Sequence, residues 1–133
     1  MTVADSSVTV AALLADHPEH QSAGEALAAC EVTIAHVALE TYSVLTRLPA
    51  PHRVDARTAA TVLEAHTPVG YVALAGEELA KVNGRLASAG VSGGASYDGL
   101  IALTALKHGL ELLSRDHRAQ RTYRSLQVPH RML

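Results

Sequence analysis

Short apolar runs of four or five residues alternate along the chain with longer segments whose apolar positions recur at helical spacing. The short runs are rich in β-branched and aliphatic side chains, and the longer segments are bounded by capping residues, Pro or Gly. This pattern predicts strands at residues 2–4, 31–35, 68–74 and 110–113, with a further edge strand near Val128.

Between these strands the pattern predicts helices at residues 7–14, 18–29, 37–48, 54–66, 76–90 and 97–109, and a basic helix that follows Asp116. Strands that alternate with helices are typical of the α/β class, in which helices cover both faces of a parallel sheet. No repeat, low-complexity tract or linker interrupts the pattern. We therefore expect one α/β domain over residues 1–133.

Composition narrows this picture. The chain has 133 residues with 48% hydrophobic positions but no Phe and no Trp, so small aliphatic side chains must fill the core. A formal net charge of −2 argues against a protein that coats duplex DNA by bulk positive potential. The lone cysteine, Cys30, cannot form an internal disulfide, and no signal peptide or membrane-spanning run is apparent. We expect a cytoplasmic protein.

Four acids stand at the ends of predicted elements. Asp5 follows the first strand and Asp116 follows the fourth, so both are expected at the edge of the sheet where ligands bind in parallel α/β folds. Glu40 lies just over one turn into a helix, in the apolar segment "HVALETYSV", and Asp98 opens the apolar helix "SYDGLIALTAL". An acid beside an apolar helical stripe costs free energy unless something pairs with it.

Carboxylates that converge on one edge repel one another and raise each other's pKa unless a cation compensates. Oxygen-only sites favour hard divalent cations, so the hypothesis is a Mg²⁺ site, with Mn²⁺ as the other candidate. Such an ion activates water and stabilises charge at phosphorus, which predicts hydrolysis of a phosphodiester. Ser7 and Ser114 are expected to hydrogen-bond the carboxylates or a metal-bound water.

Each acid also has a simpler interpretation. Asp5, Asp98 and Asp116 are all placed where they would cap a helix or favour its dipole. Glu40 would then be a surface acid, or a partner of Arg47. Spacing and periodicity alone leave both interpretations open.

Basic residues gather around the last acid. Arg115, Arg118 and Arg121 are candidates to hold an RNA backbone beside the carboxylates, and the alternative is a solvated basic helix face. The apolar stripe Leu79, Val82 and Leu86 is expected to pack on the sheet of its own chain, with a dimer contact as the alternative.

Four segments together resemble the PIN-domain ribonucleases, specifically the VapC-type toxins of bacterial toxin–antitoxin systems. These segments are "VADSSVTVAALLADHPEH", "ALETYSVLTRLP", "SGGASYDGLIALTALKHG" and "LLSRDHRAQRTYRSLQV". Their order and spacing match the family over essentially the whole chain. The resemblance implies a three-layer α/β/α PIN-like fold with a short central parallel sheet.

The same resemblance implies site residues and partners. Asp5, Glu40, Asp98 and Asp116 fall on the family's acidic quartet, with Asp5, Asp98 and Asp116 as metal ligands and Ser7 and Ser114 as supporting hydroxyls. It also implies a Mg²⁺- or Mn²⁺-dependent endoribonuclease that acts on RNA of the tRNA or rRNA class. A homodimer and a cognate VapB-like antitoxin are the implied partners.

Departures from the family pattern leave all four acids in place. Thr2 and Thr9 put hydroxyls where aliphatic side chains are usual, and Ser96 does the same ahead of Asp98. Gly99 replaces a common Ala, which lowers helix propensity by up to about 1 kcal/mol.

Two other functions compete with a nuclease. One is a non-catalytic PIN-like module whose acids dock a basic partner peptide. The other is a phosphatase with an aspartyl nucleophile, which is disfavoured because that chemistry needs a nearby Lys and the chain has only Lys81 and Lys107.

Overall fold

The computed structural model describes residues 1–133 and contains five short parallel strands. Three of them form one sheet in the order β1-β4-β5, and the other two form a second sheet, β2-β3. The predicted parallel sheet is therefore present but divided, with β1 beside β2 and no ladder between them. The strands are β1 (Thr2–Ala4), β2 (Val32–Ile34), β3 (Gly70–Val72), β4 (Glu111–Ser114) and β5 (His130–Met132).

Eight helices connect the strands, and most of them begin and end within a few residues of the predicted bounds. They are α1 (Ser6–Leu13), α2 (His20–Ala28), α3 (Ala35–Thr46), α4 (Ala56–His66), α5 (Gly76–Leu79), α6 (Val82–Ser88), α7 (Ala95–Lys107) and α8 (His117–Ser125). None of these helices has the length and apolar character that crossing a membrane would need.

The single helix predicted over residues 76–90 is wrong, because α5 and α6 are separate. Asn83 and Gly84 are poor helix formers next to the break, and Lys81 turns the chain between the two helices. Val82 and Leu86, after the break, are buried, whereas Leu79, before the break, is 49% exposed. The expected packing of the stripe within its own chain is therefore confirmed for Val82 and Leu86 alone.

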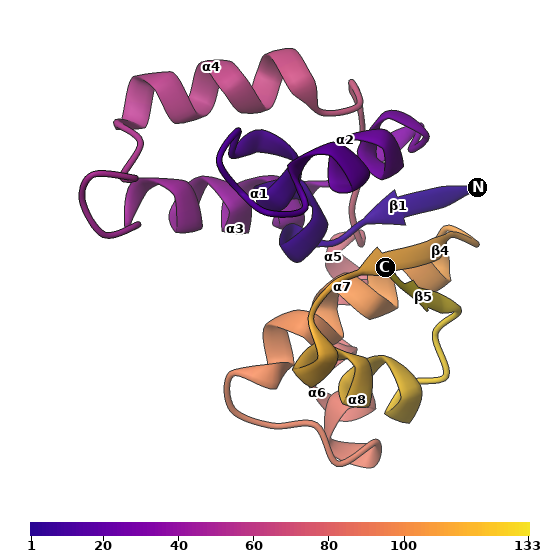
Figure 1. Cartoon of the computed structure of the whole chain (residues 1–133). Helices are drawn as coiled ribbons and strands as arrows, with labels where there is room; N and C mark the ends of the chain where they lie inside the picture. The colour runs from indigo at the N-terminus through magenta and orange to yellow at the C-terminus, as the bar shows by residue number, and fades with distance from the viewer.

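Helices cover both sides of the strands, as the alternation along the chain predicted. Figure 1 shows α1 to α4 on one side of the strands and α6 and α8 on the other. Alternate residues of the central strands supply the two cores. Val3 and Leu112 belong to the larger cluster with Tyr123, while Ala4 and Leu113 belong to a smaller cluster under α1 and α2.

Cys30 is a buried member of the smaller cluster, as expected for a small apolar side chain. Burial raises the pKa of its thiol, which disfavours the reactive thiolate.

Candidate active site

Two of the four acids, Asp5 and Asp116, follow neighbouring parallel strands. Ala4 at the end of β1 pairs with Leu113 in β4, and the backbone N–H of Asp5 donates to the carbonyl of Leu113 at 2.9 Å. Asp116 follows two residues after β4 ends. The parallel register therefore puts Asp5 and Asp116 at the same edge of the three-stranded sheet.

Asp5 is 3% exposed and both of its carboxylate oxygens are engaged. Oδ1 accepts from the backbone and hydroxyl of Ser7, at 2.9 and 2.5 Å, and from the backbone N–H of Val8 at 3.3 Å. Oδ2 accepts from the phenol of Tyr123 at 2.9 Å. Asp5 is thus the N-cap of α1 as well as an acid of this edge, and its position is fixed by contacts from two directions.

The two serines support the acids in different ways. Ser7 donates its hydroxyl to Asp5 and accepts from the backbone N–H of Arg115 at 2.8 Å, so it joins α1 to the segment after β4. Ser114 is fully buried, and its hydroxyl accepts from the backbone N–H of Asp116 at 3.1 Å. Both hydroxyls therefore accept from the backbone of residues 115 and 116 and fix the segment that carries Asp116.

Asp116 caps α8 and remains partly exposed. Its Oδ1 accepts from the backbone N–H groups of Arg118 and Ala119, at 2.9 and 3.4 Å. No hydrogen bond or ion pair of the chain engages Oδ2, so one carboxylate oxygen stays available to a ligand. The capping interpretation and the site interpretation of this aspartate are compatible.

Glu40 reaches the same region from α3. Its Oε1 accepts from the Ser6 hydroxyl at 2.9 Å, whereas Oε2 is buried and has no hydrogen-bond partner. The nearest base is His36, whose Nε2 lies 3.8 Å from Oε2. The alternative of a Glu40–Arg47 pair is wrong, because Arg47 instead donates to the Ser43 hydroxyl at 3.3 Å.

Asp98, in the first turn of α7, shows that the acids act on one another. Its pKa rises to about 6, chiefly because the carboxyl is partly buried and then because of the charges of Glu40, Asp116 and Asp5. The guanidinium of Arg118 opposes this rise. The three other predicted acids therefore lie within electrostatic reach of Asp98.

This donor set fits a hard divalent cation. The ligands are carboxylate oxygens, Arg118 offsets their mutual repulsion only in part, and Glu40 Oε2 is a buried oxygen without a hydrogen-bond partner. No group of three His, Cys, Asp or Glu side chains is close enough to hold one ion as the side chains stand. Mg²⁺ keeps several waters and commonly binds through one or two carboxylates, so a closed protein cage is not required.

Sequence reasoning missed Tyr123 as part of this site. The side chain is fully buried, and burial together with the charge of Asp5 raises the pKa of its phenol. Helical spacing alone, with Ala119, Thr122 and Leu126 on the same buried face of α8, indicates that Tyr123 points inward. Its hydroxyl needs a partner there, and a buried acid is the strongest available acceptor.

The three candidate arginines occupy different places. Arg115 lies 3.9 Å from Glu19, and its backbone is held by Ser7. Arg118 is 96% exposed and lies 3.7 Å from Asp116 Oδ1, and Arg121 lines a hollow beside α8.

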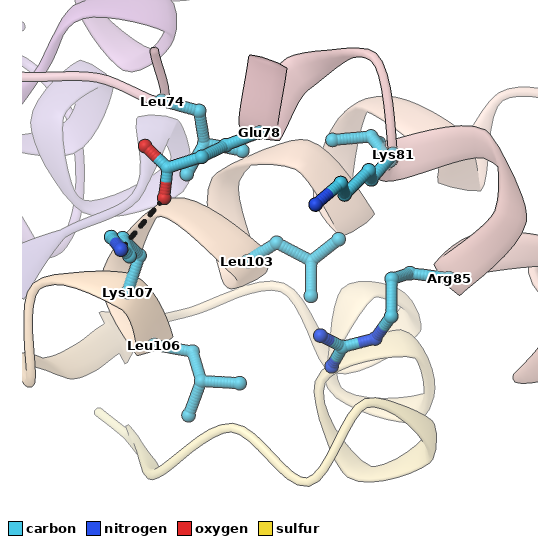
Figure 2. Close-up of a pocket in the computed structure, with 8 residues that line it drawn as sticks. Leu74, Glu78, Lys81, Arg85, Leu103, Leu106 and Lys107 are labelled. Atoms are coloured by element: carbon cyan, nitrogen blue, oxygen red, sulfur yellow. Dashed lines mark ion pairs between the residues drawn. The ribbon is translucent and has the colours of Figure 1, made fainter.

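A different hollow, of about 460 Å³, lies between α6 and α7 and contains none of the four acids. Figure 2 shows Leu103 between the side chains of Lys81 and Arg85, and Glu78 paired with Lys107. The Glu78 and Lys107 charges are 2.9 Å apart. The candidate active site is thus identified by the charges and contacts of its acids, and not by the presence of a deep pocket.

Comparison with known proteins places these features in a family. The family model described as PIN domain matches residues 2–125. The chain is 43% identical over 128 residues, 96% of each chain, to the protein named ribonuclease VapC40 of Mycobacterium tuberculosis. It is 38% identical to ribonuclease VapC27 of the same organism over 127 residues, 93% of this chain and 90% of that protein.

A solved structure shares the fold. The crystal structure of Mycobacterium tuberculosis VapC20, described as a sarcin-ricin loop cleaving toxin, matches with a TM-score of 0.68 and 19% sequence identity. The match covers 90% of this chain and 93% of that one, and it supports the expected three-layer α/β/α architecture. By family model, sequence identity and fold, this chain belongs to the PIN-domain family and, within it, to the VapC-type toxins.

Proposed function

We propose that this protein is the toxin of a VapBC-type toxin–antitoxin pair and a Mg²⁺-dependent endoribonuclease, with Mn²⁺ as a substitute ion. The observation that carries the proposal is the electrostatic coupling of Asp98 to the three other acids, which marks a cluster of negative charge that Arg118 offsets only in part. The similarity to named ribonucleases supports the same activity.

Asp5, Asp98 and Asp116 are the residues that would hold the ion. When bound, a divalent ion supplies an activated water and stabilises negative charge on the phosphate and the leaving oxygen. Asp5 is held rigidly by Ser7 and Tyr123, which keeps its carboxylate from turning away from the site. Glu40, whose Oε2 has no hydrogen-bond partner, would either hold a second ion or orient the attacking water.

The chain's basic residues would position the substrate. Arg115, Arg118 and Arg121 contact the phosphates of RNA in this proposal, without reading its sequence. We infer that the RNA is of the tRNA or rRNA class and that the protein acts in the cytoplasm as a homodimer. A cognate VapB-like antitoxin would inhibit it by laying a peptide over the acids and supplying a basic side chain to them.

The same cluster of acids is also compatible with a second function, the binding of a partner peptide. A cluster of acids with a buried unpartnered oxygen would also dock a basic peptide without any catalysis. Tight partner binding with no nuclease activity at any Mn²⁺ concentration would favour this binding module.

The test is cleavage of RNA by the purified protein with Mg²⁺, compared with Asp5→Asn and Asp98→Asn. Asp16→Asn is the matched control, because Asp16 is 63% exposed and pairs with His52 outside the site. We expect a loss of at least about 100-fold in the two site variants and wild-type activity in the control. Undiminished cleavage by both site variants would refute the proposed site.

A further inference from the structure

A small polar hollow lies between α8 and the loop that joins α6 to α7, and one of its lining residues, Arg118, contacts Asp116. The hollow encloses about 270 Å³. Its lining includes Ser92 and Ala95 from the loop and the start of α7, and Arg118, Arg121 and Thr122 from α8. We call these five residues the arginine hollow.

Positive charge dominates the arginine hollow. Arg121 takes part in no ion pair of the structure. Arg118 is 96% exposed, and its only ion-pair contact is Asp116 at 3.7 Å. No acid lines the hollow. Two guanidinium groups that share one polar cavity match the oxygens of a phosphate, because their planar donors can bind two oxygens at once.

Neutral donors complete the lining. Thr122 is only 6% exposed, lines the hollow, and forms no side-chain hydrogen bond within the chain. Ala95 begins α7, a helix of 13 residues whose first turn has no side-chain cap. The backbone N–H groups of Ser96 and Tyr97 already donate to the carbonyls of Gly93 and Gly94, at 3.1 and 3.4 Å, so the hydroxyls of Ser92 and Thr122 are the neutral donors of the lining.

The hollow is continuous with the candidate active site through Arg118. This side chain lines the hollow and also lies beside Asp116. Its charge also acts on Asp98, so a lining residue of the hollow is within electrostatic reach of two of the acids. An anion held by both arginines would lie next to the group on which the acids act.

We propose that the arginine hollow binds one backbone phosphate of the RNA, next to the phosphodiester that is cleaved. This inference rests on the proposed nuclease function and adds a specific phosphate subsite to it. An acidic peptide is the less suitable occupant, because such peptides usually dock on apolar surface as well. The hollow of Figure 2 offers such a surface with Leu74, Leu103 and Leu106, and the arginine hollow does not.

The experiment measures binding of a fluorescent single-stranded RNA to the full chain in EDTA, where no cleavage is needed. Arg121→Gln and Thr122→Val alter the arginine hollow. Arg124→Gln is the matched control, since Arg124 is an exposed arginine of α8 outside the lining. Arg85→Gln removes a charge from the other hollow.

We expect Arg121→Gln to weaken RNA binding about three- to tenfold and to reduce the slope of log affinity against log salt by about 1. Thr122→Val should weaken binding about twofold or more without changing that slope. Arg124→Gln and Arg85→Gln should leave both quantities near wild type. Equal losses in all three arginine variants, or no loss in Arg121→Gln, would overturn the proposal.

A second measurement identifies the phosphate. RNA carrying one neutral methylphosphonate linkage at successive positions should bind wild type more weakly at one position, and that position should make no difference to Arg121→Gln. A penalty of equal size in both proteins at every position would overturn the subsite. Failure of the nuclease function itself would be seen separately, as an absence of RNA cleavage by the wild type in Mg²⁺.

Discussion

The phenol of Tyr123 donates to Asp5 Oδ2 at 2.9 Å, across 118 residues of sequence, and binds the oxygen that the α1 cap leaves free. The cap bonds from Ser7 and Val8 all reach Oδ1. Asp5 is thereby fixed from α1 on one side and from α8 on the other. The orientation of this acid depends on the docking of the last helix as much as on its own strand.

Removal of the Tyr123–Asp5 hydrogen bond should therefore lower the stability of the fold and loosen the orientation of the Asp5 carboxylate. We expect Tyr123→Phe to lower the free energy of unfolding by about 1.5–3 kcal/mol, because a buried hydrogen bond to a carboxylate is lost. Denaturant unfolding measures this cost. Tyr71→Phe is the control, since Tyr71 is 56% exposed, and it should be nearly neutral. A neutral Tyr123→Phe would show that the bond contributes little.

The raised pKa of Asp98 predicts how stability changes with pH in the absence of divalent ions. Its folded-state pKa of about 6 lies above the ordinary value of 3.8, so between these values the folded protein holds a proton that the unfolded chain has released. This contribution to stability is fully present below the ordinary value and is lost as the pH rises through 6. The melting temperature of Asp98→Asn relative to wild type should therefore increase from pH 4 to pH 7. Parallel profiles for the two proteins would contradict the shift.

Mg²⁺ should reverse that loss. A cation between the acids relieves their repulsion and binds only the folded state, so it should raise the melting temperature of the wild type more at pH 7 than at pH 5. Asp116→Asn should respond less, because a carboxylate with a free oxygen is removed. Scanning calorimetry with Mg²⁺ and with K⁺ at matched ionic strength separates binding from general screening. An equal response to both salts would argue against a specific site.

Gly99 is explained by close packing rather than by backbone freedom. A Cβ at this position would overlap Cδ2 of Leu86, which is 5% exposed in the larger core cluster. We expect Gly99→Ala to destabilise the protein by about 1 kcal/mol, because an overpacking cost of about 1–3 kcal/mol exceeds the gain in helix propensity of up to about 1 kcal/mol.

A double variant tests the cause. Leu86→Ala vacates the space that the new methyl group needs, so Gly99→Ala should become stabilising in that background. If Gly99→Ala costs the same with and without Leu86, the overlap is not the reason for the glycine.

The sequence pattern predicts most of the strands and helices, because these elements depend on the local spacing of apolar and capping residues. Asp5 and Asp116 could be placed at one edge since each follows a short apolar run, and parallel strands end at the same edge. Glu40 and Asp98 were marked by apolar neighbours at helical spacing. Their electrostatic coupling is visible in the pKa of Asp98.

Other features depend on contacts that no local pattern encodes. The Tyr123–Asp5 bond joins residues 118 positions apart. The bond from Ser6 to Glu40 depends on how α1 and α3 dock, and it is made in place of the Arg47 pair that was the alternative to the site interpretation. The break between α5 and α6 was missed because the apolar stripe through Leu79, Val82 and Leu86 continues across it. Tertiary packing overrode that periodicity.

The division of the strands into two sheets has a consequence for the spacing of the acids. Asp5 and Asp116 are anchored to one set of ladder hydrogen bonds, while Glu40 follows a strand that belongs to the other set. Side-chain packing and the single bond from Ser6 span the seam between them. No backbone pairing between strands therefore fixes the distance from Glu40 to Asp5 and Asp116, and that distance depends on how the side chains of α1 and α3 pack.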